Sequence, residues 1–397
     1  MDGDTNRTRR TFLTGTGTLA VGALAGCLGG QGGPAGGNGS GETNGTGNES
    51  GEGENETAGG SETPYTVSMA PVGEVEFEAV PETFAAYEPG YADMAVALGR
   101  GDGLLSVGLK ERYYTDVYDE LDGVSVDTDS LTALVDNGID REVFYELGAD
   151  LHLMDPQWLV NNGSFGLEQS DIDAVADQVA PFFGNTIFRR TDEWHDYEYY
   201  TLYEAFGKVA EVFQEGERYE AFAAVHDAML EEVEANLPGE DERPNALLTY
   251  AAADEPEEFS PYRVSGEGTN KKQFHDLGID DALEGTGISG LSTTERGTID
   301  YETMLEVDPD SILVRGHETK TEEEFRETVL AYMQQDSVAS ELTAVQEERV
   351  FRGGPIYAGP IHNLFLTERF AGLYYPDAFS GELFDRSEVS DVVTGTF

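Results

Sequence analysis

Short apolar runs alternate with amphipathic segments from Tyr65 onward, and no other property of the sequence limits the possible folds as strongly. Segments with helical periodicity, such as Ala92–Leu98 and Arg112–Leu121, lie between the runs. This alternation of strands and helices predicts an α/β fold with mostly parallel sheets. Five runs have the length and composition of buried strands: Leu104–Val107, Leu151–Met154, Ala246–Thr249, Ile312–Val314 and Arg349–Phe351.

An internal repeat divides this region into two similar parts. The pattern Glu-x-x-x-Glu-(Leu/Val)-x-x-Asp occurs at residues 142–150 and again at 302–310, each time just before a predicted strand. The offsets 302 − 142, 306 − 146 and 310 − 150 are all 160. Coincidence in a Glu-rich chain is the alternative, but the shared helix–turn–strand context disfavours it. The repeat predicts two lobes of similar construction.

A long helical segment lies between the two copies of the repeat. It extends from Gly216 to Leu237, where Pro238 and Gly239 end it. About twenty residues at 1.5 Å each give a helix roughly 30 Å long, the width of a small domain. We therefore expect a helix that joins the two lobes. The apolar face of this helix consists of Tyr219, Phe222, Val225/His226, Met229/Leu230 and Val233.

The first 27 residues have the pattern of an export signal. Two adjacent arginines, Arg9 and Arg10, precede a short apolar stretch that ends in Leu-Ala-Gly-Cys at Cys27. The stretch is too short to remain as a membrane span, and its end resembles a lipobox. We expect a twin-arginine signal, export in the folded state and a diacylglyceryl-type anchor on Cys27. A buried structural cysteine is the alternative.

Residues 28–64 have the composition of a flexible spacer. They contain 14 Gly and 6 Glu, no Lys or Arg, and almost no large apolar side chain. Such a segment cannot bury enough surface to offset its chain entropy. It contains four N-x-S/T sequons, and a fifth begins at Asn162; glycosylation of some is plausible in an exported protein, although chance produces sequons equally well in such a tract.

Charge and cysteine content exclude several classes of protein. The chain has 23 Lys and Arg against 78 Asp and Glu, a net charge of −55, which argues against nucleic-acid binding. The single cysteine excludes a disulfide framework, a multi-cysteine zinc site and a cysteine-ligated iron–sulfur cluster. An acid excess spread along a folded chain is typical of a high-salt habitat, where counterions screen the repulsion. Most carboxylates then form a solvated coat.

The order of these segments resembles the metal-chelate class of ABC-transporter solute-binding proteins, which serves importers of iron–siderophore complexes, haem and corrinoids. The resemblance covers residues 66–397 and departs at Gly148-Ala149-Asp150, where Pro-Asp is usual. It implies two Rossmann-like lobes joined by a single long bridging helix, with a ligand cleft between them. Five stretches carry it: residues 92–99, which end in Ala-Leu-Gly, then 142–153, 206–237, 301–314 and 342–379.

The expected domain organisation follows from these observations together. The chain divides into a signal (1–27), a linker (28–64), an N-terminal lobe (65–205), a helical segment with the bridging helix (206–237) and a C-terminal lobe (238–397).

The loops after the strands are the place to search for a ligand site, because open α/β sheets bind ligands at the carboxyl ends of their strands. Aromatic side chains suit a large planar ligand, and Arg suits carboxylate or phosphate groups. These loops offer Tyr87, Tyr91, Tyr113, Tyr114, Trp158, Tyr250, Tyr262, Arg263, Arg315, His317, Tyr357 and His362. The ligand-binding candidates selected from them are Tyr91, Tyr113, Trp158, Tyr250, Arg263, Arg315, His317 and Tyr357.

Several candidates also have a structural explanation. Trp158 can pack a surface loop. An unpaired charge directly after a buried strand is costly, so we expect Arg315 in the cleft or in an ion pair. His317 could chelate iron together with Tyr357, although a lone His is more often a structural residue. No metal-ligand motif occurs, so we expect no cofactor, and any metal arrives already chelated.

Two glutamates are candidates for contact with a transporter. In the family that the sequence resembles, one Glu on each lobe docks against arginines of the permease subunits, and Glu142 and Glu302 match those positions. Equivalent residues on two lobes suit a partner with two-fold symmetry. The resemblance implies an ABC permease dimer with its ATPase subunits as the partner of a monomeric binding protein. Two ordinary glutamates in an acid-coated protein are the alternative.

The expected function is capture of a metal chelate outside the cell, with an iron–siderophore complex first, and cobalamin or haem next. We expect a lipid-anchored protein on the extracellular face of the membrane, without enzymatic activity. An exported metal-dependent or hydrolytic enzyme is the first alternative, but no G-x-S-x-G, H-E-x-x-H or phosphate-binding Gly loop occurs. A structural cell-surface protein is the second alternative, and it would not need the long helix.

Overall fold

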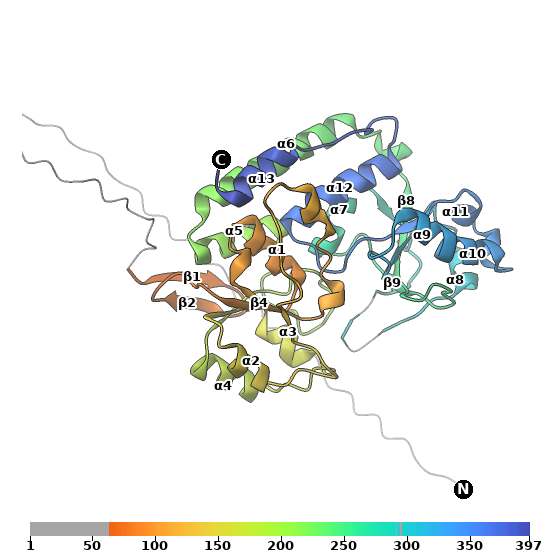
Figure 1. Ribbon diagram of the computed structural model, residues 1–397. Helices are drawn as coiled ribbons and strands as arrows, with labels where there is room; N and C mark the ends of the chain where they lie inside the picture. Colours follow the sequence, from red (N-terminus) through yellow and green to blue (C-terminus); the bar gives the residue numbers. More distant parts are fainter. Residues whose placement is uncertain (1–62, 291, 294–295) are drawn as a thin grey trace, which may run out of the picture. The chain divides into compact units, whose positions relative to one another are not determined.

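The computed structural model describes residues 63–290, 292–293 and 296–397 (Figure 1). The chain separates into two units, Met1–Thr57 and Ala58–Phe397, and the description below concerns the second. The expected export signal, Cys27, and the linker with its four sequons lie outside the described residues. Among the described residues, no helix combines the length and apolarity that a membrane span requires.

The N-terminal lobe is built on a five-stranded parallel sheet in the order β5-β4-β3-β6-β7. Apolar side chains fill the central strands, which are buried on both faces as parallel sheets require. The strands are β3 (Phe84–Ala86), β4 (Leu104–Val107), β5 (Thr132–Ala133), β6 (Leu151–Leu153) and β7 (Phe182–Phe183). The helices of this lobe are α1 (Pro89–Ala97), α2 (Glu142–Leu147), α3 (Pro156–Asn161) and α4 (Gln169–Gln178).

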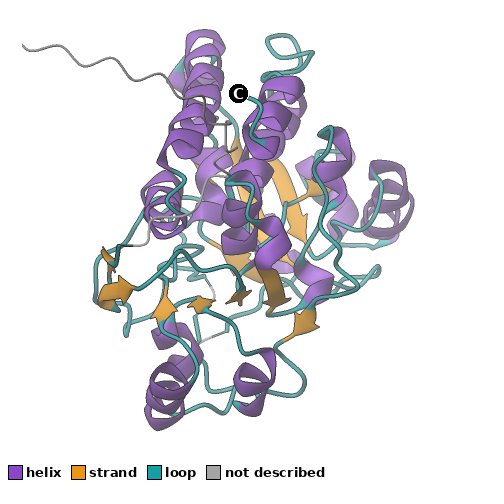
Figure 2. Cartoon of the chain, turned by 60° about the vertical axis from the view of Figure 1, so that its left-hand side comes forward, coloured by secondary structure: helices purple, strands orange, loops and turns teal. Residues whose placement is uncertain are grey.

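The C-terminal lobe has a second sheet with the order β10-β8-β11-β12, in which all pairs are parallel, and one antiparallel strand, β9, beside β8. Figure 2 shows the strands inside and the helices around them. The strands are β8 (Asn245–Tyr250), β9 (Ser260–Tyr262), β10 (Asp280–Asp281), β11 (Ser311–Arg315) and β12 (Val350–Arg352). The helices are α7 (Lys272–Asp276), α8 (Tyr301–Val307), α9 (Glu322–Phe325), α10 (Ala331–Gln335) and α11 (Thr343–Gln346).

The α/β fold with two mainly parallel sheets is thus confirmed, and each of the five predicted strand segments forms a strand. The segment at residues 112–121, expected as a helix, instead forms two 3-10 turns at Lys110–Arg112 (η2) and Asp116–Glu120 (η3). Both Tyr113 and Tyr118 turn inward, where their hydroxyl oxygens lie 3.1 Å apart. Residues five apart on an α-helix point about 140° from each other, so a regular helix could not bury both.

The internal repeat has a structural role in each lobe. Helices α2 and α8 each end in a residue with left-handed backbone, Gly148 (φ 55°) and Asp308 (φ 44°), and the chain then enters β6 or β11. The last Asp of each copy caps the start of the neighbouring strand: Asp150 accepts from the Thr83 backbone N at 2.9 Å, and Asp310 accepts from the Asn245 N at 2.9 Å. The repeat therefore fixes the central pair of strands in both sheets.

Long helices connect the two sheets. Helix α6 (Gly216–Asn236) packs against α5 (Leu202–Phe213), against α13 (Arg386–Thr394) and against α7 of the C-terminal lobe (Figure 1). Its buried face consists of Phe222, Val225, His226, Met229 and Val233, as the sequence predicted. Helix α12 (Pro360–Tyr374) contacts both α1 and α7. One apolar core runs from the first sheet through these helices to the second.

A short antiparallel hairpin precedes the first sheet. It consists of β1 (Tyr65–Met69) and β2 (Gly73–Phe77), and β1 packs against α5. The Tyr65 hydroxyl donates to the Val212 carbonyl oxygen at 2.5 Å, which ties the hairpin to the helical layer.

A buried carboxylate joins the two lobes where α1 meets α12. Asp93 is fully buried on α1, and it accepts hydrogen bonds from the Ile361 N at 2.8 Å and the Tyr118 hydroxyl at 2.7 Å. Its Oδ1 lies 3.1 Å from the Nδ1 of His362. Helix α12 has no side-chain cap of its own, since its N-cap is Gly359, so Asp93 caps it from the other lobe.

The surroundings of His362 favour its imidazolium form. Its Nε2 lies 2.7 Å from the Tyr114 carbonyl oxygen, so both ring nitrogens face acceptors. Burial alone would lower the pKa of His362, but Asp93 and the Tyr114 carbonyl outweigh burial and raise that pKa above its ordinary value. The raised pKa therefore favours the ion pair with Asp93.

We expect Asp93→Asn to lower the free energy of unfolding by about 3 kcal/mol at neutral pH, because it leaves a buried imidazolium without its counter-charge. The difference in the free energy of unfolding between the wild type and this variant should be largest below the ordinary His pKa. It should decline as the pH rises through the raised pKa of His362. Denaturant unfolding across this pH range measures it. Asp102→Asn, at an exposed position, is the control. Equal stability of both variants at every pH would contradict the role given to Asp93.

Candidate functional site

The loops that leave the carboxyl ends of the two sheets line a shared cavity of about 310 Å³. In the N-terminal lobe they follow β3, β4, β5, β6 and β7, and in the C-terminal lobe β8 and β12 with β9. The cavity therefore lies between the lobes, at the place that the fold predicts for a ligand. Its lining consists of Tyr87, Leu109, Arg112, Val135, Trp158, Asn162, Ser164, Phe165, Phe188, Arg189, Tyr250, Ser260, Tyr262, Arg296, Ile356 and Tyr357.

The charge of this lining is opposite to that of the whole chain. Three arginines, Arg112, Arg189 and Arg296, line the cavity, and no Asp or Glu does so among the described residues. In a chain with 78 acidic and 23 basic residues, such a lining is a local reversal of charge. Arg guanidinium groups bind carboxylate, phosphate and phenolate oxygens, so the cavity suits an anionic ligand.

Aromatic rings from both lobes form the walls. Tyr357 of the C-terminal lobe packs against Phe188 and Tyr87 of the N-terminal lobe, with ring centroids 4.8 Å and 6.1 Å apart. Trp158 lies 5.2 Å from Phe188 in the same cluster. Burial raises the pKa of Tyr87 and of Tyr357, so both hydroxyls stay protonated at neutral pH and can donate to an anion.

The lining arginines are held in place by their neighbours. The Arg189 guanidinium lies 5.0 Å from the Trp158 ring centroid, and its Nη2 lies 3.1 Å from Asp192. The guanidinium of Arg112 lies 5.8 Å from the ring of Tyr250, across the gap between the lobes. Stacking on aromatic rings orients a guanidinium. Asp192 occupies the Nε–Nη2 edge of Arg189, whereas Arg112 has no carboxylate partner among the described residues.

A second, smaller hollow of about 270 Å³ extends the cavity towards Tyr114 and Gly354. It shares Arg112, Tyr250 and Ile356 with the main cavity, so the two are continuous.

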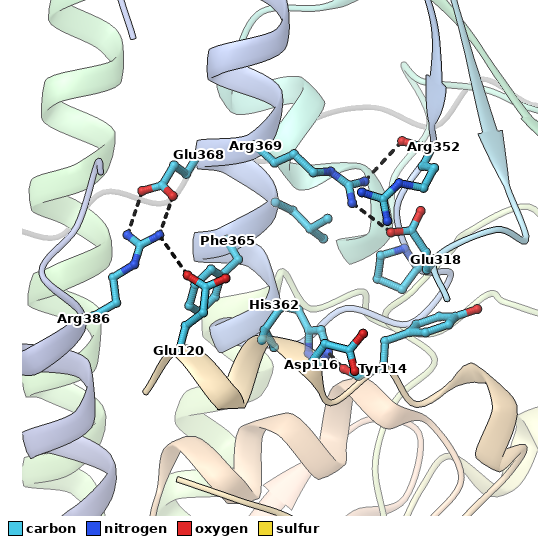
Figure 3. A pocket seen from close by; sticks show the side chains of 13 residues that line it. Tyr114, Asp116, Glu120, Glu318, Arg352, His362, Phe365, Glu368, Arg369 and Arg386 are labelled. Carbon is cyan, nitrogen blue, oxygen red and sulfur yellow. Dashed lines mark hydrogen bonds and ion pairs between the residues drawn. The ribbon is translucent and has the colours of Figure 1, made fainter. Parts of the chain in front are cut away.

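A third hollow of about 320 Å³ lies between η3 and α12, and Figure 3 shows its side chains. Its charges neutralise one another: Arg369 pairs with Glu318 at 2.9 Å, and Arg386 pairs with Glu368 and approaches Glu120 at 3.8 Å. In the main cavity Arg189 is likewise paired, with Asp192, but Arg112 and Arg296 form no ion pair among the described residues, so of the two only the main cavity has unpaired positive charge.

Glu318 is the most buried carboxylate of the third hollow. It also accepts from the Gly354 N at 2.8 Å. Burial would raise the pKa of Glu318, but Arg369 and the hydrogen bonds outweigh burial and hold that pKa below its ordinary value.

Three of the eight ligand-binding candidates line the main cavity: Trp158, Tyr250 and Tyr357. The other five lie outside this lining, and their contact with a ligand stays a prediction. Tyr91 bonds Asn185 through its hydroxyl, which donates to the Asn185 O at 2.9 Å and accepts from the Asn185 N at 2.8 Å. Tyr113 faces Tyr118.

The remaining three candidates belong to the C-terminal lobe. His317 is buried and packs edge-on against Phe325, with ring centroids 5.5 Å apart. Arg263 donates to the Leu283 carbonyl oxygen and lies 3.9 Å from Asp281. Arg315 is fully buried behind Tyr262. Among the described residues, no three His, Cys, Asp or Glu side chains gather as metal ligands.

Sequence reasoning missed all three lining arginines. Arg112 lies in the 3-10 turn η2, where the sequence predicted a regular helix, and Arg189 lies in the loop after β7. In neither place does a pattern mark the side chain as facing a cavity. One signal was available: only 18 arginines occur in the chain, and both of these follow a strand of the N-terminal sheet within a few residues.

The two candidate docking residues occupy equivalent positions. Glu142 and Glu302 are exposed in the first turns of α2 and α8. Each helix leads directly into a strand, so its first turn lies towards the edge of the sheet from which the cavity loops emerge. Glu142 lies 3.5 Å from Arg141, and its side chain is 64% exposed.

Two similarly built lobes with a ligand cavity between their sheets define a two-lobe binding protein. Residues 84–357, more than half of the chain, match the family model described as periplasmic binding protein. The chain belongs to the periplasmic binding protein family, whose members are extracytoplasmic, non-enzymatic components of transport systems. No curated protein matches the sequence.

Three solved structures illustrate the similarity of fold. CeuE of Helicobacter pylori, solved with Ni(II) bound, is 12% identical, with 83% of this chain and 96% of that chain covered and a TM-score of 0.56. The substrate-binding protein PiuA of an iron uptake ABC transporter from Streptococcus pneumoniae is 16% identical (76% and 96% covered, TM-score 0.50). The periplasmic heme-binding protein HutB of Vibrio cholerae is 11% identical (74% and 100% covered, TM-score 0.51). At these identities the likeness concerns the fold.

We expect Glu318→Gln to lower the free energy of unfolding by about 3 kcal/mol at neutral pH, because Arg369 loses its buried counter-charge. The contribution of Glu318 should be present above the ordinary Glu pKa and should disappear as the pH falls through its lowered pKa. Thermal unfolding as a function of pH measures it. Glu322→Gln is the matched control, since Glu322 is half-exposed and lies 3.7 Å from Arg352. A loss of the same size in both variants would show that burial of Glu318 is irrelevant.

Proposed function

We propose that the protein captures an anionic metal chelate, an iron–siderophore complex in the first place, and delivers it to an ABC importer. The observation that carries the proposal is the main inter-lobe cavity, whose described lining has three arginines and several aromatic rings and contains no carboxylate. Siderophore-type chelates combine aromatic or planar groups with negatively charged oxygens, and such a lining complements both.

The size of the cavity suits a small-molecule ligand. The main cavity of about 310 Å³ and the adjoining hollow of about 270 Å³ both lie near the lower end of small-molecule sites, and together they lie within that range. The proteins of similar fold support a chelate as the ligand class, since CeuE was solved with Ni(II), PiuA is named for iron uptake and HutB for heme binding. The metal comes as part of the ligand in this proposal.

The route to the membrane is part of the proposal. A twin-arginine signal exports the folded protein, a lipid on Cys27 anchors it on the extracellular face, and the Gly-rich linker holds it above the membrane. Glu142 and Glu302 then dock the protein, as a monomer, onto the two subunits of a permease dimer served by its ATPase subunits.

We expect Arg112→Gln to weaken binding of a trianionic ferric tris-catecholate by roughly 10- to 100-fold, because a charged hydrogen bond in the cavity is lost. Quenching of tryptophan fluorescence provides the measurement, since Trp158 lines the cavity. Arg100→Gln is the control, because Arg100 pairs with Glu215 at 2.8 Å outside the cavity. Unchanged affinity in the Arg112 variant would show that this arginine does not bind the ligand. Failure of the wild type to bind any ferric, haem or corrinoid ligand would refute the proposed function.

We expect the double variant Glu142→Ala/Glu302→Ala to bind the chelate normally and to support little uptake of it. Charge pairs at the rim of an interface mainly set encounter and register, so the defect should appear in transport and in permease binding. Uptake of radioactive iron by cells, compared with binding by the purified variant, separates the two steps. The control is Glu146→Ala/Glu306→Ala, one helical turn further along the same repeat. Normal uptake by the first double variant would refute the docking role.

A further inference from the structure

Arg315 is a buried cation without a carboxylate partner. It ends β11 and is completely buried; its Nε donates to the Gly353 O at 3.3 Å, its Nη2 donates to the Asn270 O, and its guanidinium faces Tyr262. Its Nη1 has no hydrogen-bond partner among the described residues. A buried charge normally requires pairing or complete hydrogen bonding, so the isolation of Arg315 needs an explanation.

The position of Arg315 relative to the cavity provides that explanation. Its guanidinium carbon lies 5.0 Å from the centroid of the Tyr262 ring, and Tyr262 lines the cavity. One aromatic ring therefore separates this charge from the space that a ligand would occupy. In a water-excluded site of low effective dielectric, a charge acts strongly over such a distance.

Lys271 is a second buried cation in the same wall. It directly follows Asn270, whose carbonyl oxygen accepts from Arg315, and its exposed fraction is 1%. The segment around it also touches the other lobe, since the Thr269 N donates to the Ile187 O at 2.9 Å, beside the lining residue Phe188. No carboxylate forms an ion pair with Lys271 in the described part of the chain.

The charged groups that face Lys271 come from four surrounding segments. Arg315 on β11 and Arg189 in the loop after β7 are positive, while Asp281 on β10 and Glu267 in the preceding loop are negative. Asp281 is already engaged, since it accepts from the Ser265 hydroxyl at 2.6 Å and from the Leu283 N at 2.9 Å. Burial, and after it the positive charge of Arg315, lower the pKa of Lys271 to about 7.

One other Arg or Lys side chain is almost fully buried in the described part of the chain, and it has an acidic partner: Arg189 pairs with Asp192. Arg315 and Lys271 are exceptions, and both lie behind the C-terminal wall of the cavity. Leaving two such charges uncompensated costs stability, and an anion in the cavity would remove that cost.

We propose that Arg315 and Lys271 form a buried second layer of positive charge, which makes the cavity select chelates by their negative charge and makes binding take up a proton from solvent at Lys271. The proposal rests on the proposed function of chelate capture. It assigns specificity to two residues that do not line the cavity. An anion favours the charged form of Lys271, so its affinity is highest at low pH and falls as the pH rises past neutrality.

The test uses Lys271→Met, which removes the charge, and Lys271→Arg, which makes it permanent. The probes are a trianionic ferric tris-catecholate and a neutral ferric tris-hydroxamate, titrated by calorimetry in buffers of different ionisation enthalpy between about pH 7 and 9. For the wild type we expect trianion affinity to fall about tenfold over this range, with proton uptake near neutrality. Lys271→Met should bind the trianion weakly at every pH, and Lys271→Arg should bind it strongly at every pH.

Several results would overturn the proposal. The first is an equal loss of affinity for both probes in Lys271→Met. The second is the absence of proton uptake when the wild type binds the trianion. The third is a trianion affinity that still depends on pH in both variants. Arg315→Lys against Arg315→Met tests the other residue, with the charge-conserving variant expected to retain preference for the trianion. The control is Lys208→Met, since Lys208 pairs with Glu211 on the surface.

A ligand-free measurement separates this proposal from the proposed function. Because the pKa of Lys271 is lowered in the folded state, its charge destabilises the protein fully below about pH 7, and this effect declines as the pH rises towards the ordinary Lys pKa. Lys271→Met should therefore unfold at a higher temperature than the wild type near pH 7, and the difference should shrink near pH 9. A constant difference, or a loss of stability, refutes the buried charge even if the wild type binds no chelate.

Discussion

The geometry of the ligand cavity depends on the buried carboxylate of Asp93. This side chain lies on the first helix of one lobe, caps the first turn of α12 in place of a missing local cap, and faces the imidazolium of His362. Both helices begin at the carboxyl ends of their sheets, so the contact fixes the two sets of cavity loops against each other. The continuous apolar core through α6 and α12 adds rigidity. A site held in this way needs little reorganisation on binding, which favours affinity.

The repeat explains why the two lobes present their loops in the same manner. Asp150 and Asp310 each cap the neighbouring central strand, so the sheet edges that carry the cavity are set by the same interaction twice. The exposed Glu142 and Glu302 begin the same two repeats. A single structural unit thus determines both the inner surface, where a ligand would bind, and a symmetric pair of outer positions, where a two-fold partner would fit.

Sequence reasoning could predict the architecture because buried parallel strands are short apolar runs, and the 160-residue repeat marks two lobes. It found Trp158, Tyr250 and Tyr357 because they follow predicted strands. It could not place Arg315, because the covering ring of Tyr262 comes from the antiparallel strand β9, which no apolar run had indicated. Of the lining arginines, Arg112 lies in a 3-10 turn and the other two lie in loops. The directions of their side chains depend on contacts between the lobes, and no local sequence pattern contains those contacts.

The contrast between an acidic exterior and a basic cavity has a consequence for recognition in concentrated salt, the environment that the acid excess predicts. At about 1 M salt the Debye length is near 3 Å, so the carboxylate coat neither repels nor guides a distant anion. Salt screens a charge that is buried behind a ring such as that of Tyr262 much less. Only such buried charges therefore still interact strongly with an anion in the cavity. Selection by charge therefore has to come from buried cations, and a second layer behind the cavity wall achieves this without placing more arginines in contact with the ligand.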